Sequence, residues 1–319
     1  MTTMINPQMG PMSEGLPGAG SALFERTISP RLVHRAFDND VFVANVRVLG
    51  YNTFEVGVRW PGTHDFYGPV TPDTHDPLLF LECVRQAGLL LAHVAFDIPN
   101  EYKFVIHEKQ FSVSPAGLHT DDGGRPVDVK LIVTAHDIRR RGRRFAGMRF
   151  DFACMRDGEQ VAFARYLWSC VSAPGYDKLR GTRRQAVPPS RAGFELVAPA
   201  RVGRRDELDV MLAETPVADV WTLCIAPDHP SVYDHHFDHV PGTGAIEVAR
   251  QAALLALGEP TALPVRSDCS FTHYVEFDQP CLVHAEVEFV GEDRIATVRV
   301  TFTQDGRTAA ECRLGMLVR

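Results

Sequence analysis

The stretch ECVRQAGLLL, residues 82–91, decides the fold, because it places polar side chains inside a segment that is otherwise apolar. The surrounding sequence PLLFLECVRQAGLLLAHVAF, residues 77–96, is apolar nearly all the way round a helix. That pattern is typical of a buried helix rather than an amphipathic one. Asp76 followed by Pro77 suits an N-cap and a first-turn proline. We therefore expect a buried helix from about residue 76 to 95.

A second copy of this motif occurs late in the chain, as EVARQAALLA at residues 247–256. PRLVHRAFDNDV at residues 30–41 also resembles PARVGRRDELDV at residues 199–210. Several identical residues recur at one constant separation of 165 positions (247 minus 82). They are Glu82 with Glu247, Arg85 with Arg250, Gln86 with Gln251, His64 with His229 and Asp73 with Asp238. The order of these matches indicates a duplicated domain.

Strand patterns fill the rest of each half. β-Branched and aromatic residues predict strands at 41–48, 54–60, 127–138, 143–158 and 159–171, and again at 281–291, 294–306 and 307–318. The Asp-Gly pairs at 157–158 and 305–306 are hairpin turn signals. One buried helix against several antiparallel strands, twice over, predicts an α+β double hotdog. Two curled antiparallel sheets each wrap one central apolar helix, and we expect them to join edge to edge.

The predicted boundaries follow from composition. Residues 1–28, rich in Gly, Pro and Met, are expected to form a mobile tail and carry no secretion-signal pattern. Residues 29–172 form the first hotdog domain and 195–319 the second. Residues 173–194, rich in Pro, Gly and Arg, have the composition of a linker. The result is a pseudo-dimer within one chain, and further pairing into a homodimer is left open.

Bulk properties exclude several classes of function. The net charge of −7 gives no electrostatic footprint for nucleic acid. No apolar run approaches the roughly 20 residues of a membrane helix. The seven dispersed cysteines indicate free thiols and a cytoplasmic protein. The basic run RRRGRR at residues 139–144 is either a solvated turn between two strands or a docking patch for an acidic partner.

Glu82, Arg85 and Gln86 share one face of the first helix, as Glu247, Arg250 and Gln251 share one face of the second. The simple interpretation is an Arg–Glu pair that neutralises itself within each helix. Buried ions seldom repay their desolvation as stability, however. The alternative is a functional site between the two copies.

The loop before the second helix, DHPSVYDHHFDHVPGTG at residues 228–244, is rich in functional residue types. Gly242, Thr243 and Gly244 are expected to present backbone N–H groups at a helix N-terminus, which attracts anions and polarises carbonyls. His239 is a candidate catalytic histidine. A zinc site at His235, His236 and His239 is a weaker alternative, because no Cys or carboxylate spacing completes it. We expect no metal and no cofactor.

These motifs together resemble the AfsA-type family, the γ-butyrolactone and butenolide autoregulator synthases of Streptomyces and related bacteria. The resemblance rests on VHRAFDNDVFV, RWPGTHDFYGPV, DPLLFLECVRQAGLLLAH, FDHVPGTGAIEVARQAA and RRGRRFAGMRFDF, and covers about residues 30–319. It implies a tandem hotdog acyltransferase. The implied reaction joins a β-ketoacyl thioester, carried on acyl carrier protein or CoA, to dihydroxyacetone phosphate. The resulting ester can close to a butenolide phosphate.

Within that reaction, a partly buried carboxylate with a raised pKa suits the general base. We assign this role to Glu82, with Glu247 as the second candidate and His239 as a further catalytic candidate. A phosphate calls for an arginine fork, for which we choose Arg250 and then Arg85. Candidate substrate-binding residues are Arg85, Gln86, Gln251, Asp76, Gly242 and Thr243. Candidates for an acyl tunnel, which are more commonly plain core, are Leu79, Phe80, Cys83 and Ile246.

Two other functions stay open from the sequence. One is a different hotdog enzyme, a thioester dehydratase or thioesterase, which needs no phosphate anchor. The other is a non-catalytic ligand-binding regulator, for which neither Glu82 nor Arg250 would matter to signal production.

Overall fold

The computed structural model describes residues 22–318 except 26–27, 122 and 143. Its first half contains β1 (Val43–Gly50), β2 (Thr53–Trp60), α1 (Pro77–Val94), β3 (Lys103–Val113), β4 (Val127–Arg141), β5 (Arg144–Arg156) and β6 (Glu159–Val171). A short helix follows, α2 (Ala173–Arg180). The second half contains β7 (Leu212–Ala213), β8 (Val220–Leu223), α3 (Gly242–Leu257), β9 (Leu263–Phe271), β10 (Leu282–Val290), β11 (Ile295–Gln304) and β12 (Arg307–Leu317).

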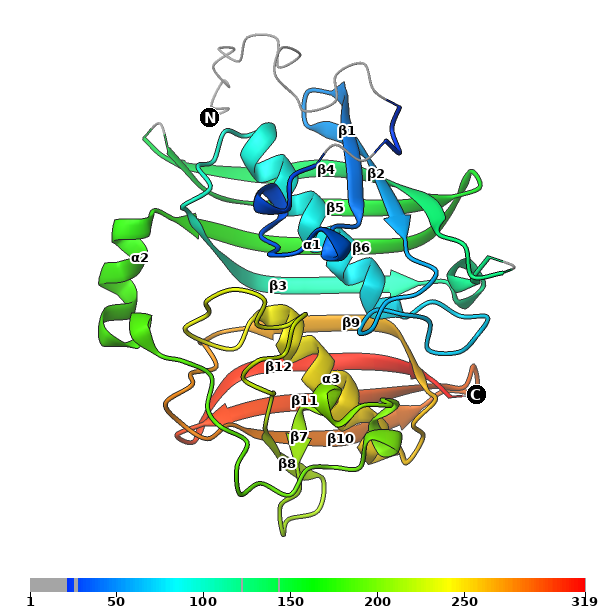
Figure 1. Cartoon of the computed structure of the whole chain (residues 1–319), viewed down its shortest axis with the longest axis vertical. Coiled ribbons are helices and arrows are strands. Elements are labelled where there is room, and N and C mark those ends of the chain that lie inside the picture. Colours follow the sequence, from blue (N-terminus) through cyan, green and yellow to red (C-terminus); the bar gives the residue numbers. More distant parts are fainter. Residues whose placement is uncertain (1–21, 26–27, 122, 143, 319) are drawn as a thin grey trace, which may run out of the picture.

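All twelve strands form one antiparallel sheet, in the order β1-β2-β4-β5-β6-β3-β9-β12-β11-β10-β8-β7. The second half of this order repeats the first in reverse, as a duplication with an internal pseudo-twofold requires. The halves join through β3 and β9, which pair from Glu108 opposite Ser270 to Ser112 opposite Arg266. The double hotdog is confirmed, and its two sheets are one continuous sheet across that junction (Figure 1).

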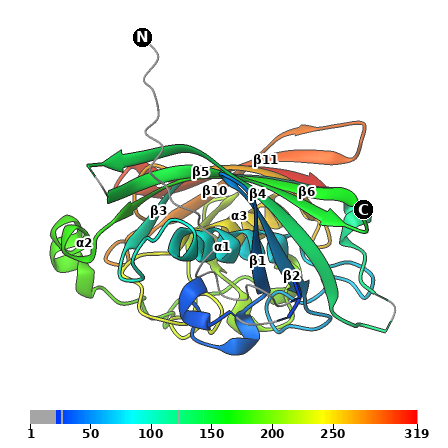
Figure 2. The ribbon, with the colours of Figure 1, turned by 90° about the horizontal axis from the view of Figure 1, so that it is seen from above.

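Helices α1 and α3 lie on the same face of this sheet, one against each half (Figures 1 and 2). Asp76 caps α1 by accepting a hydrogen bond from the Leu78 N–H, as the Asp-Pro sequence predicts. Helix α1 is long and apolar enough to cross a membrane, but 78% of it is buried inside the fold. It is therefore a core helix of the hotdog, and its apolar surface is covered by the sheet.

The hairpins follow the sequence closely. Asp157 and Gly158 both have positive φ, as do Asp305 and Gly306, which is the geometry of a two-residue type I′ turn. The described residues of the basic run are the end of β4 and the start of β5, where Arg141 pairs with Arg144 across the turn. Its interpretation as a turn between strands is confirmed for the described residues.

Strands β3, β7, β8 and β9 and helix α2 were not predicted. Strands β3 and β9 join the halves, yet β3 carries a bulge between Ile106 and Glu108 that breaks the alternation of buried and exposed residues. Helix α2 lies in the segment 173–194, where composition indicated only a linker. The predicted N-terminal tail falls mostly outside the described residues, but Leu23 and Ile28 within it are buried.

Candidate functional site

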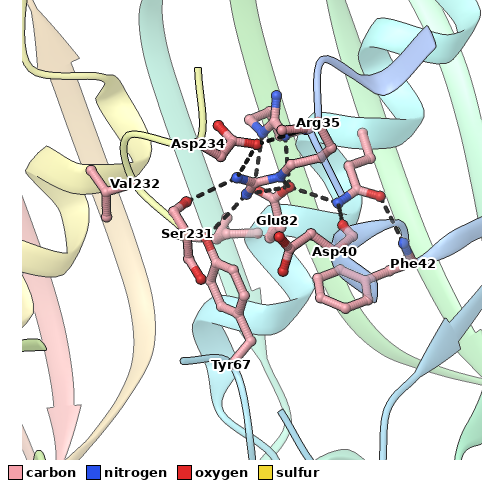
Figure 3. Close-up of polar contacts among 12 residues, drawn as sticks. Arg35, Asp40, Phe42, Tyr67, Glu82, Ser231, Val232 and Asp234 are labelled. Atoms are coloured by element: carbon pink, nitrogen blue, oxygen red, sulfur yellow. Dashed lines mark hydrogen bonds and ion pairs between the residues drawn. The ribbon is translucent and has the colours of Figure 1, made fainter. Parts of the chain in front are cut away.

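The Glu-x-x-Arg-Gln motif of α1 forms a buried hydrogen-bonded group, here called the first-half cluster (Arg35, Glu82, Arg85 and Gln86). Glu82 accepts hydrogen bonds from Arg35 Nε at 3.0 Å, from Arg85 Nε at 2.8 Å and from Gln86 Nε2 at 2.7 Å. Gln86 also accepts from the Phe42 N–H at 2.8 Å and donates to the Asp40 carbonyl at 2.7 Å. The motif therefore anchors the chain that leads into β1 (Figure 3).

The same arrangement recurs on α3 as the second-half cluster (Arg204, Glu247, Arg250 and Gln251). Glu247 accepts from Arg204 Nε at 3.1 Å, from Arg250 Nε at 2.8 Å and from Gln251 Nε2 at 2.7 Å. Gln251 anchors the chain before β7 through the Met211 N–H and the Asp209 carbonyl. The repetition explains why both helices keep an acid, a base and an amide at one spacing.

Each cluster also reaches into the opposite half. Arg35 Nη1 donates to the Ser231 carbonyl at 2.8 Å and pairs with Asp234 at 3.4 Å. Figure 3 shows its guanidinium between Glu82 of α1 and the loop that carries Ser231 and Asp234. Arg204 Nη1 donates to the Phe66 carbonyl at 2.8 Å. The two clusters therefore join the halves as well as anchoring their own strands.

The predicted raised pKa of Glu82 is wrong. Burial alone would raise the pKa of this carboxyl, but the Arg35 and Arg85 guanidiniums and the hydrogen bonds to it lower the pKa to about 2. Glu247 responds in the same way to Arg204 and Arg250, and its pKa is also about 2. Both carboxylates border a pocket of about 10 Å³ between α1 and α3, space for about one water, and neither lines the main cavity. This geometry favours the self-neutralised ion pairs left open above.

Several other predicted substrate-binding residues also lie away from open space. Arg250 is buried against Glu247, and Asp76 is buried as the α1 cap, so neither lines the main cavity. Gln86 and Gln251 are fully buried and serve as anchors. The tunnel candidates Leu79, Phe80, Cys83 and Ile246 are core residues.

The main cavity has a volume of about 790 Å³ and lies at the junction of the two halves. It is bordered by α1, by β3, by the segment around α2 and by the loop that leads into α3. Its apolar lining comes from side chains of α1 and of the sheet: Leu89, Phe104, Ile106, Phe150 and Trp168. Polar side chains line the rest, most of them from the loop before α3 and from the segment around α2. A cavity of this size and mixed character is typical of a site for a small, partly apolar ligand.

His239 belongs to the polar lining and is the one predicted catalytic residue with a catalytic geometry. Its Nδ1 donates to Asp238 Oδ1 at 2.7 Å, and its side chain is 23% exposed. Because the carboxylate only accepts, Nδ1 carries the hydrogen, and the neutral ring keeps its lone pair on Nε2. The structure therefore pairs this candidate catalytic histidine with a carboxylate that can orient it beside the cavity.

Asp238 is fixed by residues that the sequence analysis missed. It accepts from the Tyr176 hydroxyl at 2.8 Å and from Arg180 Nε at 3.2 Å, and Arg180 also binds Glu276. Burial raises the pKa of Asp238, but the hydrogen bonds from His239 and Tyr176 and the Arg180 charge outweigh it, so the pKa is lowered. Tyr176 and Arg180 belong to α2, and its polar sequence gave no periodic signal for a helix.

The first turn of α3 borders the same cavity at Gly242 and Thr243. Pro241, the N-cap, supplies no side-chain hydrogen bond, and the first intrahelical bond runs from the Ala245 N–H to the Pro241 carbonyl. The N–H groups of Gly242, Thr243 and Gly244 precede that bond. They suit the predicted role of stabilising negative charge, whereas the first turn of α1 is occupied by the Asp76 cap.

The three loop histidines have separate partners. His235 donates to Asp234, His236 contacts the Arg184 carbonyl, and His239 donates to Asp238. Among the described residues, no group of three His, Cys, Asp or Glu side chains has the arrangement of a metal site.

One continuous sheet that carries two buried helices, with a cavity where the halves meet, defines a double hotdog protein. A solved structure of similar fold is the 12:0-ACP thioesterase from Umbellularia californica, with a TM-score of 0.51 at 12% identity, covering 85% of this chain and 99% of that chain. At this identity the likeness concerns the fold alone.

The chain belongs to the AfsA family, described as the A-factor biosynthesis hotdog domain, whose profile matches residues 20–172 and 188–318. A relative from Streptomyces virginiae is 37% identical over 91% of this chain and 97% of its own length. Another from Streptomyces griseus is 35% identical over 87% of this chain and 91% of its own length. Both relatives are named 2-oxo-3-(phosphooxy)propyl 3-oxoalkanoate synthase.

Proposed function

We propose that this protein transfers a β-ketoacyl group from a thioester to dihydroxyacetone phosphate. The observation that carries the proposal is the pair of relatives whose name describes an ester between a 3-oxoalkanoate and a 2-oxo-3-(phosphooxy)propyl group. That phosphorylated group is the ester residue of dihydroxyacetone phosphate. The main cavity supports it, because part of its lining is apolar and suits an acyl chain while the rest is polar.

His239 is the proposed general base. The hydroxyl of dihydroxyacetone phosphate attacks the thioester carbonyl and gives its proton to His239 Nε2. The C–O bond forms, the C–S bond breaks, and the proton passes to the departing thiolate. Asp238 holds the imidazole in the required tautomer through the 2.7 Å hydrogen bond. This assignment replaces Glu82, whose carboxylate is already occupied by two arginines.

The N–H groups at the start of α3 are the proposed oxyanion donors. Gly242 and Thr243 border the cavity close to His239, which lies three residues before the start of α3. Donors fixed by a helix cost no reorganisation when the carbonyl oxygen gains charge. The acyl chain then lies along the apolar lining formed by Leu89, Phe150 and Trp168.

One catalytic centre per chain is proposed. Thr74 stands in the first half where His239 stands in the second, at the same offset that relates Asp73 to Asp238. The neighbouring His75 is fully buried and packs edge-on against Trp60. The first half contributes α1 and β3 to the walls of the cavity, and the second half contributes the base.

The proposal is tested by incubating the purified protein with a β-ketoacyl thioester and dihydroxyacetone phosphate and identifying products by mass spectrometry. A phosphorylated ester, or the butenolide phosphate formed by its ring closure, is expected only with enzyme and both substrates. Comparing acyl carrier protein, CoA and N-acetylcysteamine thioesters identifies the donor. Formation of free acid or enoyl thioester alone would contradict the proposal in favour of a thioesterase or dehydratase.

A further inference from the structure

Three side chains that line the main cavity have no role in the mechanism above, and two of them carry positive charge. They are His34, after the turn of residues 30–33, Arg85 of α1 and Lys103 at the start of β3, and all three line the cavity. Lys103 is half-buried and forms no ion pair with any described residue. Burial and the nearby Arg184 charge lower its pKa, and the Asp238 and Asp177 charges raise it. Because the pKa is lowered on balance, a bound anion would further stabilise the charged ammonium.

Arg85 is more exposed than Arg250, its counterpart in the second half, and it lines the cavity, as a residue that contacts a ligand must. Both Arg85 and Arg250 bind the glutamate three residues earlier through Nε and Nη2. The Arg85 side chain is 17% exposed and lines the cavity, whereas the Arg250 side chain is 4% exposed and does not. Since Glu82 occupies Nε and Nη2, Arg85 retains Nη1 as a donor toward a ligand.

His34 has a left-handed backbone, with φ of 50°, at the position where the second half has Gly203 with φ of 66°. A histidine is strained there and a glycine is not, so the fold itself does not demand the histidine. Its ring stacks on His93, with Nε2 atoms 3.0 Å apart, and His93 Nδ1 donates to the Ile98 carbonyl at 2.6 Å. Because His93 Nδ1 carries a hydrogen, His93 Nε2 is an acceptor in the neutral ring. His34 Nε2 therefore donates to it, and His34 Nδ1 is left as an acceptor.

Burial and the charges of His93, Arg85, His235 and Lys103 lower the pKa of His34 to about 3, so its ring is neutral. It therefore adds no charge to the cavity lining, and its free Nδ1 can accept a hydrogen bond from a hydroxyl of a bound ligand. Residues with a strained backbone often lie at ligand-binding sites.

We propose that Arg85, Lys103 and His34 form the subsite for the phosphate group of the acceptor substrate, an inference that rests on the proposed function. Arg85 Nη1 and the Lys103 ammonium supply the donors, and His34 Nδ1 accepts a hydrogen bond from a protonated phosphate oxygen. Lys103 is also electrostatically coupled to Asp238, the partner of His239. The subsite is thus next to the proposed base, as a three-carbon phosphate with its reacting hydroxyl at the far end requires.

The test measures binding of inorganic phosphate by calorimetry, independently of turnover. We expect one phosphate per chain and a Kd at least about tenfold weaker in Lys103→Gln, because a charge-assisted contact is lost. Lys178→Gln, which removes an exposed lysine of α2 outside the cavity, is the matched control and is expected to bind as the wild type does. His34→Gly adopts the residue of the repeat and is expected to weaken phosphate binding severalfold without lowering Tm.

Kinetics provide a second readout with an N-acetylcysteamine thioester, a donor that has no phosphate. Lys103→Gln is expected to raise KM for dihydroxyacetone phosphate by about tenfold or more and to leave KM for the thioester unchanged. Phosphate binding that is equal in Lys103→Gln, His34→Gly and wild type, an adventitious ion only, would overturn the subsite. So would an increase confined to the thioester KM. If phosphate binds as expected but no ester forms, the acyl transfer fails and the anion site remains.

Discussion

At the scale of single residues, the proposed acyl transfer depends on His239 as the general base. His239 faces the cavity with a carboxylate behind it, and Glu82 is enclosed by two guanidiniums and an amide. Sequence alone gives the residue types and their spacing on the helix. It does not give the partner of Glu82, because Arg35 is 47 positions away and reaches it only through the tertiary fold.

His239→Gln should lower kcat of acyl transfer by about 10² to 10⁴, because the proton of the attacking hydroxyl loses its acceptor. Thermal stability should stay close to that of the wild type. His284→Gln, an exposed histidine on β10, is the control and should retain full activity. A His239→Gln enzyme with wild-type kcat would remove His239 from the mechanism.

Glu82→Gln should destabilise the protein by about 3–5 kcal/mol in urea unfolding, because Arg35 and Arg85 then share no carboxylate in a buried site. Glu247→Gln should behave alike. Glu286→Gln, at an exposed ion pair with Arg299, should have a much smaller effect. Complete loss of activity in a Glu82→Gln protein of unchanged stability would instead restore Glu82 as the base.

Lys109 on β3 is a buried lysine that sequence reasoning passed over. Its Nζ has no hydrogen-bond partner among the described residues and lies 4.5 Å from the centre of the Tyr166 ring. Burial lowers its pKa to about 7, despite the attraction of Glu82. In a strand pattern, a single lysine is normally predicted to face solvent. Lys109 is buried because β9 pairs with β3 at the junction of the two halves.

Lys109→Met should therefore stabilise the protein by roughly 1–4 kcal/mol at pH 6, where the wild-type amine is charged in both states. The folded pKa lies below the unfolded value, so the unfolded state binds more protons between pH 7 and about 10.5, and wild-type stability rises with pH across that window. The methionine variant should lack this rise. Urea titrations at several pH values make the comparison, and a variant less stable than wild type at pH 6 would refute it.

At the scale of elements, the two helices are the part of the fold that sequence predicts best. Their apolar periodicity, the Asp76-Pro77 start and the repeated motif each specify a buried helix locally. Strands β3 and β9 are harder to predict from the sequence, because a bulge in β3 and polar residues at the junction interrupt the alternation of apolar and polar residues. Helix α2 acquires its role from long-range partners, since Arg180 binds Asp238 and Glu276 in the second half.

The clusters on α1 and α3 predict a defined acid transition. The folded pKa of Glu82 and of Glu247 is about 2, below the ordinary value of 4.5, so their stabilisation is present above pH 4.5 and is lost as the pH falls toward 2. The free energy of unfolding should fall there by up to about 2.7 kcal/mol per pH unit from these two groups. Urea unfolding at successive pH values tests this, and an unchanged free energy between pH 5 and 2.5 would contradict it.

At the scale of the whole molecule, the duplicated scaffold has one main cavity among its described residues, and both halves contribute to its lining. The repeat is faithful where it anchors the chain, as in the pairs Gln86 with Phe42 and Gln251 with Met211. It diverges where the cavity is lined, with His239 against Thr74 and His34 against Gly203. Sequence predicts the duplicated scaffold, but only packing decides which half keeps open space beside its helix N-terminus.

In the proposed reaction, acyl groups leave this cavity on dihydroxyacetone phosphate and not on water. The most direct measurement is the ratio of phosphorylated ester to free β-keto acid formed per thioester consumed, as the concentration of dihydroxyacetone phosphate is raised. We predict that the ester accounts for nearly all consumed thioester at saturating acceptor and that free acid falls in proportion. Free acid released at one rate whatever the acceptor concentration, with no ester, would contradict the acyltransferase and identify a hydrolase.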